Sequence, residues 1–165
     1  MATSSPYRML PIDRRVDLVA HDLKSSKEAR DGYIQRMVSR KGGFRPVTLR
    51  SWPVDKLARE IVRLNMETPQ DELGLLQTLY VEREPDLQIA FLDGAGVAHS
   101  NGQIPEDLAT PFADPARVRR AAEQLIAQRG DAARHYLRTI AYYNGEAWPN
   151  LLDMLDERDG PTTTP

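Results

Sequence analysis

The chain of 165 residues contains no cysteine, and this absence excludes several kinds of protein at once. Without thiols there is no disulfide scaffold, no thiolate zinc or iron–sulfur site and no cysteine nucleophile. Long apolar stretches are missing too: no run approaches the roughly 18–20 residues that a membrane-spanning helix requires. The composition, with 41% apolar and 28% charged residues, is that of a folded domain without a membrane span.

Several catalytic and cofactor-binding motifs are also missing. Gly94 and Gly96 lack the third glycine and the preceding strand of a dinucleotide-binding fingerprint, and no Gly-Lys-Ser or Gly-Lys-Thr triplet of a phosphate-binding loop occurs. There is no Gly-x-Ser-x-Gly nucleophile elbow. The histidines, which are His21, His99 and His135, do not have the spacing of a zinc-binding helix. The sequence therefore predicts no catalysis, no cofactor and no structural metal.

Helical periodicity runs through most of the chain. Apolar residues recur every three or four positions from residue 12 onward, in stretches separated by proline and glycine. This pattern predicts an all-α fold, a single irregular bundle of about seven or eight short helices over residues 11–158. A solenoid-like stack of the C-terminal helices is an alternative. Residues 1–10 are expected to form a flexible leader and residues 159–165 a disordered tail.

The ends of these stretches carry helix start and stop signals. Thr68, followed by a proline and an aspartate, and Asp114, followed by a proline, are expected to cap the helices that begin after them. Gly130 is expected to separate two helices. Residues 44–50 alternate weakly between polar and apolar, but Pro46 cannot donate to a strand ladder, so an extended connector is expected there.

Charge is distributed unevenly along the chain, whose net charge is −2. Residues 1–65 contain 14 basic and 7 acidic residues, whereas residues 66–165 contain 8 basic and 17 acidic ones. This asymmetry favours an acidic partner for the first part, self-association, or attraction between the two parts. Arginine outnumbers lysine by 18 to 4, which is typical of a GC-rich bacterial genome. No secretory signal is recognised, so a cytoplasmic location is expected.

The densest positive charge lies between residues 36 and 52. Five basic residues alternate there with two aromatic rings: Arg36, Arg40, Lys41, Phe44, Arg45, Arg50 and Trp52. The segment leaves a helix at two glycines, so it is expected to lie on the surface, and arginine beside an aromatic anchor is typical of binding hot spots. The sequence thus predicts a non-enzymatic interaction or adaptor module that binds an acidic protein partner or a second copy of itself.

Other interpretations of the same segment stay open. Phe44 and Trp52 could pin a connector to the helical core while the arginines meet acidic residues of the same chain. Alternatively, arginines that hold phosphates and rings that stack on bases would make a nucleic-acid-binding accessory protein. The pI of about 5.9 is low for a nucleic-acid-binding domain.

A different candidate site is the glycine-rich loop between residues 93 and 106. Asp93, His99 and Glu106 could hold a metal ion or act in a small enzyme, or the loop could be a connector built from turns and caps.

Two further expectations concern the C-terminal part of the chain. His135 is expected at the surface, and one of the neighbours Tyr142 and Tyr143 is expected to be exposed because adjacent helical residues point in different directions.

Overall fold

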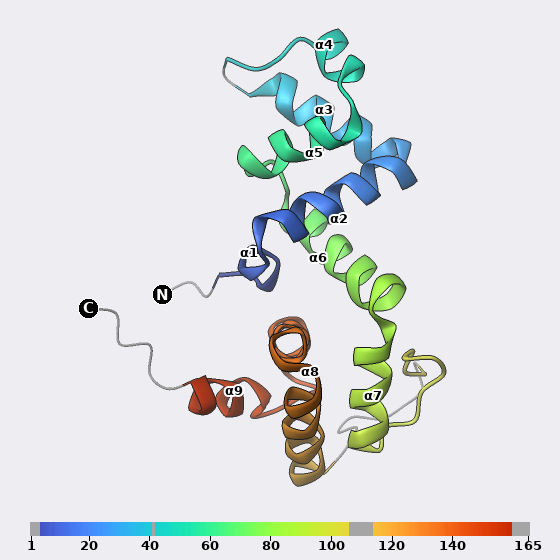
Figure 1. Cartoon of the computed structure of the whole chain (residues 1–165), viewed down its shortest axis with the longest axis vertical. Coiled ribbons are helices and arrows are strands. Elements are labelled where there is room, and N and C mark those ends of the chain that lie inside the picture. Colours follow the sequence, from blue (N-terminus) through green and yellow to red (C-terminus); the bar gives the residue numbers. More distant parts are fainter. Residues whose placement is uncertain (1–3, 41, 106–113, 160–165) are drawn as a thin grey trace, which may run out of the picture. The chain divides into compact units, whose positions relative to one another are not determined.

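A computed structural model describes residues 4–40, 42–105 and 114–159, and every regular element in these ranges is a helix (Figure 1). The order is α1 (Pro6–Met9), α2 (Ile12–Ser25), α3 (Lys27–Ser39), α4 (Pro46–Ser51), α5 (Val54–Arg63), α6 (Pro69–Gln77), the π-helix η1 (Thr78–Arg83), α7 (Pro85–Ala95), α8 (Pro115–Tyr143) and α9 (Leu151–Asp159). Within the described ranges, β-type pairing is limited to an isolated bridge between Ser100 and Gln103. The predicted all-α fold class is confirmed.

The chain divides into two compact units. Unit 2 is Leu10–Thr78, and unit 1 combines Met1–Met9 with Leu79–Pro165. The sequence predicts one helical domain over residues 11–158, whereas the structure divides this range between the two units, each with its own buried residues. Of the tail expected at residues 159–165, residues 160–165 lie outside the described residues, and residue 159 is the last of α9.

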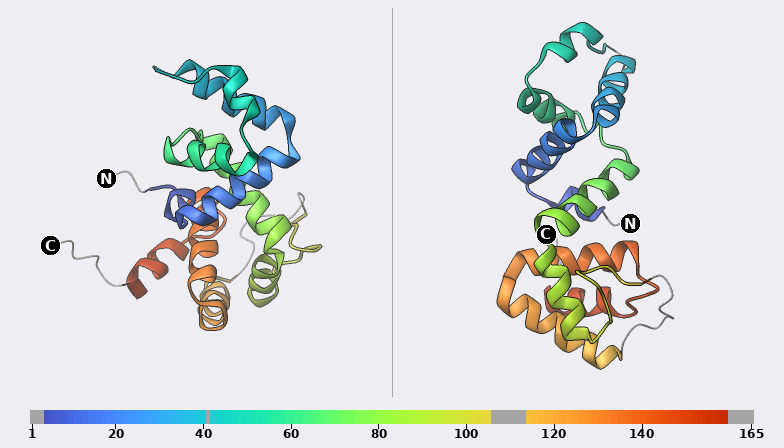
Figure 2. Two further views of the ribbon diagram at one scale, coloured as in Figure 1. Left: turned by 45° about the horizontal axis from the view of Figure 1, so that its top comes forward. Right: turned by 90° about the vertical axis from the view of Figure 1, so that its right-hand side faces the viewer.

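Unit 2 is built on the packing of α2 against α5 (Figure 2). Leu18 of α2 is almost completely buried, and so are Leu57 and Ile61 of α5. Tyr33 of α3 and Leu49 of α4 complete this core. Because the apolar positions recur at helical spacing, each helix buries one face and leaves the other to solvent.

The helix α4 corrects the expectation of an extended connector over residues 44–50. Pro46 is the first residue of α4, where its missing N–H leaves no hydrogen bond unmade. Leu49 is fully buried and anchors α4, which packs on α3. The helix has six residues and one buried side chain, so its apolar residues do not repeat often enough for a helical period to be recognised in the sequence.

Unit 1 contains a row of aromatic rings in edge-to-face contact. Tyr80 of η1 meets Tyr136 of α8 with ring centroids 5.1 Å apart, and Tyr136 meets Phe91 of α7 at 6.0 Å. Phe91 in turn meets Trp148, in the turn before α9, at 5.2 Å. The row joins four segments of the unit through large buried surfaces.

Three helix boundaries fall where the sequence predicts them. Thr68 and Asp71 form a reciprocal capping box at the start of α6, and the Asp114 side chain accepts a hydrogen bond from the first turn of α8. Gly130 interrupts α8 with φ 56° and ψ −130°, so the predicted separation into two helices is confirmed. Tyr142 is the exposed member of its pair, also as expected.

The N-terminal residues differ from the expected flexible leader. Residues 6–9 form α1, and Tyr7 is fully buried. His135 of α8 donates from Nε2 to the Pro6 carbonyl oxygen at 2.7 Å, so its Nδ1 is the acceptor for the Tyr80 hydroxyl. His135 was expected at the surface, but it is a half-buried link between α1, η1 and α8.

The contribution of the His135 hydrogen bonds to the stability of unit 1 can be tested by substitution. His135→Ala is expected to lower the free energy of unfolding of unit 1 by about 1–3 kcal/mol, because two polar groups lose their partners where water has limited access. Urea unfolding should be followed by the fluorescence of Trp148 in a Trp52→Phe background. His135→Gln, which keeps a donor and an acceptor, is expected to lose less. Equal midpoints for His135→Ala and the parent would contradict the prediction.

Candidate functional site

The residues predicted to bind a partner lie on consecutive pieces of unit 2. Arg36 belongs to α3, Arg40 follows its last residue, and Phe44 and Arg45 lie in the loop before α4. Arg50 is in the last turn of α4, and Trp52 is its C-cap. Lys41 lies outside the described residues.

The loop between α3 and α4 turns at a glycine. The Gly43 N–H donates to the Arg40 carbonyl oxygen at 2.7 Å. A Cβ atom at Gly43 would come within 2.6 Å of the carbonyl oxygens of Arg40 and Val38, and closer still to that of Met37. Gly42 has a left-handed φ of 73°. The path of the chain from α3 to α4 therefore requires glycine at these positions.

The two aromatic residues enclose α4. Phe44, before the helix, meets Trp52, after it, with ring centroids 5.2 Å apart and planes at 71°. Lys56 of α5 places its Nζ 4.3 Å from the centre of the Trp52 ring. Both aromatic side chains are half-buried, whereas Val47 between them in sequence is 79% exposed. The pair therefore fastens α4 at both ends and still leaves apolar surface beside Val47.

Arg36 is held by contacts inside unit 2. Its Nη2 donates to Asp71 Oδ2 at 2.7 Å, and its Nε donates to the Met66 carbonyl oxygen at 3.1 Å. The guanidinium also lies 4.5 Å from the centre of the Tyr33 ring. Arg36 thus joins α3 to the start of α6, which leaves its guanidinium little capacity to bind a partner.

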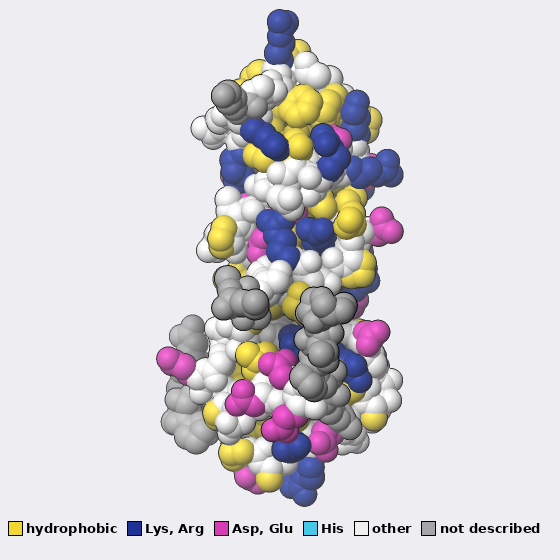
Figure 3. Space-filling view, turned by 90° about the vertical axis from the view of Figure 1, so that its left-hand side faces the viewer, with side chains coloured by type: hydrophobic (Ala, Val, Ile, Leu, Met, Phe, Trp, Pro, Cys, Tyr) yellow, Lys and Arg dark blue, Asp and Glu magenta, His cyan; other side chains and the backbone are white. Residues whose placement is uncertain are grey.

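Unlike Arg36, the other arginines of the segment are exposed to solvent. Arg40, Arg45 and Arg50 are exposed, and none of the carboxylates in the described ranges pairs with them. In the upper part of Figure 3, which shows one face of unit 2, dark blue side chains lie among yellow ones. We call the surface formed by six residues of this segment the basic–aromatic surface: Arg40, Phe44, Arg45, Val47, Arg50 and Trp52.

A basic stripe along α5 was missed in the sequence. Lys56, Arg59 and Arg63 follow Trp52 at intervals of four, three and four residues, which places them on one side of the helix. This spacing is visible in the sequence, although the predicted binding segment ends at Trp52. Arg63 donates to both carboxylate oxygens of Glu60, and this hydrogen bonding holds the pKa of Glu60 below its usual range.

Burial raises the pKa of two groups in unit 2, Tyr33 and Asp22. Tyr33 is fully buried, and this burial, reinforced by the negative charges of Asp71 and Asp22, raises the pKa of its hydroxyl far above the usual value. Burial is also the main cause of the raised pKa of Asp22, with the charge of Asp71 adding to it. A phenol this reluctant to ionise in the core is not a nucleophile in neutral solution.

The glycine-rich loop of unit 1 uses its histidine to hold its own backbone. The Gly102 N–H donates to His99 Nδ1 at 3.0 Å, so Nε2 carries the proton and donates to Asp93 Oδ1 at 2.9 Å. Gln88 also fastens the loop by donating to the Gly102 carbonyl oxygen. In the described part of the chain, no three potential ligands gather into a metal site. Glu106 lies outside the described residues.

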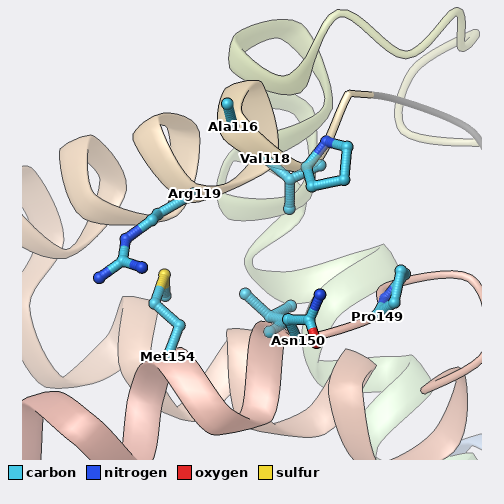
Figure 4. Close-up of a pocket in the computed structure, with 8 residues that line it drawn as sticks. Ala116, Val118, Arg119, Pro149, Asn150 and Met154 are labelled. Carbon is cyan, nitrogen blue, oxygen red and sulfur yellow. The ribbon is translucent and has the colours of Figure 1, made fainter.

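A small cavity of about 220 Å³ lies beside the start of α8 in unit 1 (Figure 4). Its walls are mostly apolar, with Val118 on one side and Met154 on the other. Arg119 reaches toward Met154 at the rim, but it is also 3.4 Å from a Glu123 carboxylate oxygen and 3.6 Å from one of Glu157. The cavity holds no acid, base or nucleophile at its centre, and we assign it no chemistry.

The fold and this site describe an all-α protein whose most distinctive surface is basic and partly apolar. Comparison with protein-family models, with curated proteins and with solved structures found no match. In the described ranges no helix combines the length and apolar character needed to cross a membrane.

Proposed function

We propose that unit 2 is a docking module that binds an acidic segment of a partner protein at the basic–aromatic surface. The observation that carries this proposal is the set of three exposed arginines, without carboxylate partners in the described ranges, beside the exposed side chain of Val47. Arginine supplies several directed donors to a carboxylate, and the neighbouring apolar surface supplies contact area that a purely electrostatic site would lack.

A protein partner fits this surface better than a nucleic acid. Lys56 covers part of the Trp52 ring and Phe44 packs against it, so less ring surface is left for a stacked base. Val47 offers an aliphatic contact, which suits an apolar side chain. Unit 2 carries 13 basic and 10 acidic residues, a modest excess compared with the strongly basic footprint of nucleic-acid-binding domains.

Charge reversal tests the proposal. The probe is a fluorescent peptide in which leucines alternate with glutamates, compared with an all-glutamate peptide and a single-stranded oligonucleotide. The variant Arg40→Glu/Arg45→Glu/Arg50→Glu is expected to bind the leucine–glutamate peptide at least about a hundredfold more weakly, because attraction becomes repulsion at three positions. Its melting temperature is expected to stay unchanged, since the three side chains are exposed.

A second triple variant controls for net charge. Lys24→Glu/Lys27→Glu/Arg120→Glu changes the charge by the same amount at exposed positions that are not among the six residues of the basic–aromatic surface, and it is expected to bind like the parent. Retained peptide binding in the first variant would refute the proposal. Tighter binding of the oligonucleotide than of either peptide, with a steep loss as salt rises, would favour a nucleic-acid partner instead.

A further inference from the structure

The basic–aromatic surface continues along α5 to a cavity. From Lys56 to Arg63 the helix rises about 10 Å, and the stripe ends where the last turn of α5 meets the first turn of α2. A cavity of about 450 Å³ lies there. Its lining consists of Ile12, Asp13, Arg15, Val16, Arg59, Val62, Arg63 and Asn65. All of these residues belong to unit 2.

The cavity combines apolar walls with a basic rim. Val62 is buried, Val16 is half-buried, and Ile12 is 63% exposed although it is the first residue of α2. Arg59 stands on the rim, and none of the described carboxylates pairs with it. Five of the eight lining residues are charged or polar, and the other three, Ile12, Val16 and Val62, form an apolar part of the wall that an aliphatic side chain can contact.

We infer that the acidic partner carries an apolar anchor residue that enters this cavity while its carboxylates lie along Lys56 and Arg59. This inference rests on the proposed function and adds the form of the partner to it. The length of about 10 Å corresponds to three residues of extended chain, so the anchor and the carboxylate that meets Lys56 lie about three residues apart in such a partner.

Charge on the rim favours this occupant over a small free anion. Asp13 lines the cavity together with the arginines, and Glu60 already accepts hydrogen bonds from Arg63. These carboxylates reduce the attraction for a free phosphate. An apolar anchor side chain is stabilised by burial against the apolar part of the cavity wall. The carboxylates beside the anchor meet Lys56 and Arg59 outside the cavity, so a peptide segment uses both the apolar wall and the positive charge.

The test compares two acidic peptides that differ only in the anchor, which is leucine in one and serine in the other. The parent protein is expected to bind the leucine peptide about tenfold or more tightly, because burying such a side chain is favourable by more than the equivalent of a factor of ten. Ile12→Ser removes part of the apolar wall, and Val16→Phe fills the space. Each variant is expected to remove most of the preference for leucine and to leave the affinity for the serine peptide unchanged.

The control is Val81→Ser, which removes a similarly exposed apolar side chain from unit 1 and is expected to keep the preference. Equal binding of the two peptides to the parent, with both lost on charge reversal of Arg40, Arg45 and Arg50, would overturn the anchor and leave the proposed function standing. Failure of the parent to bind either peptide would refute both. Displacement of the leucine peptide by inorganic phosphate, but not by chloride at equal ionic strength, would show an anion site and also overturn the anchor.

Discussion

Phe91→Ala is expected to lower the free energy of unfolding of unit 1 by about 3–5 kcal/mol, the largest effect of any substitution considered. Phe91 is completely buried in α7 and lies between the rings of Tyr136 and Trp148. Truncation removes two edge-to-face contacts and leaves a cavity that surrounding helices can fill only in part. Because domains are stable by only about 5–15 kcal/mol, such a loss brings the unit close to unfolding.

The two tryptophans allow each unit to be followed by itself, since Trp52 lies in unit 2 and Trp148 in unit 1. In a Trp52→Phe background, the urea midpoint of Trp148 fluorescence is expected to fall sharply for Phe91→Ala. Leu152→Ala truncates a side chain that is 37% exposed on α9 and is expected to cost less than about 1 kcal/mol. Similar midpoints for the two variants would show that the aromatic row does not hold the unit together.

The sequence predicts those parts of the fold whose signals are local. The capping box at Thr68, the cap at Asp114 and the break at Gly130 each depend on residues within one turn, and each was found where the sequence placed it. α1 and α4 were not predicted, because helices of four and six residues show too little periodicity. Their stability comes from packing, through the burial of Tyr7 and Leu49, and packing partners are not written in a local pattern.

The candidate site shows the same limit. Composition indicates a basic and aromatic segment, but it does not show which arginine is used inside the fold. Arg36 meets Asp71 across 35 positions of sequence, and His135 meets Pro6 across 129. Arg40, Arg45 and Arg50 look equivalent to Arg36 in the sequence and differ only because the folded chain brings no described carboxylate to them.

Asp71→Ala is expected to cause the largest loss of stability in unit 2 among the substitutions considered, about 2–4 kcal/mol. One carboxylate oxygen accepts three hydrogen bonds, from the Thr68 N–H at 2.8 Å, the Thr68 hydroxyl at 2.9 Å and Arg36 at 2.7 Å. The substitution therefore removes the cap of α6 and the ion pair with α3 together. It also removes a negative charge that raises the pKa of Asp22, and the easier ionisation of Asp22 offsets a small part of the loss.

Three further variants separate the contributions to the stability loss of Asp71→Ala, and one of them also tests whether Arg36 takes part in peptide binding. In a Trp148→Phe background, Thr68→Ala is expected to lose only the part due to the cap, and Asp71→Asn the part due to the charge. Arg36→Met is expected to lower the stability of unit 2 and to leave binding of the leucine–glutamate peptide unchanged once the protein is folded. If Arg36→Met instead weakened peptide binding as strongly as reversal of Arg40, Arg45 and Arg50, at unchanged stability, Arg36 would belong to the binding surface and its contacts with Asp71 and Met66 would have to yield to the partner.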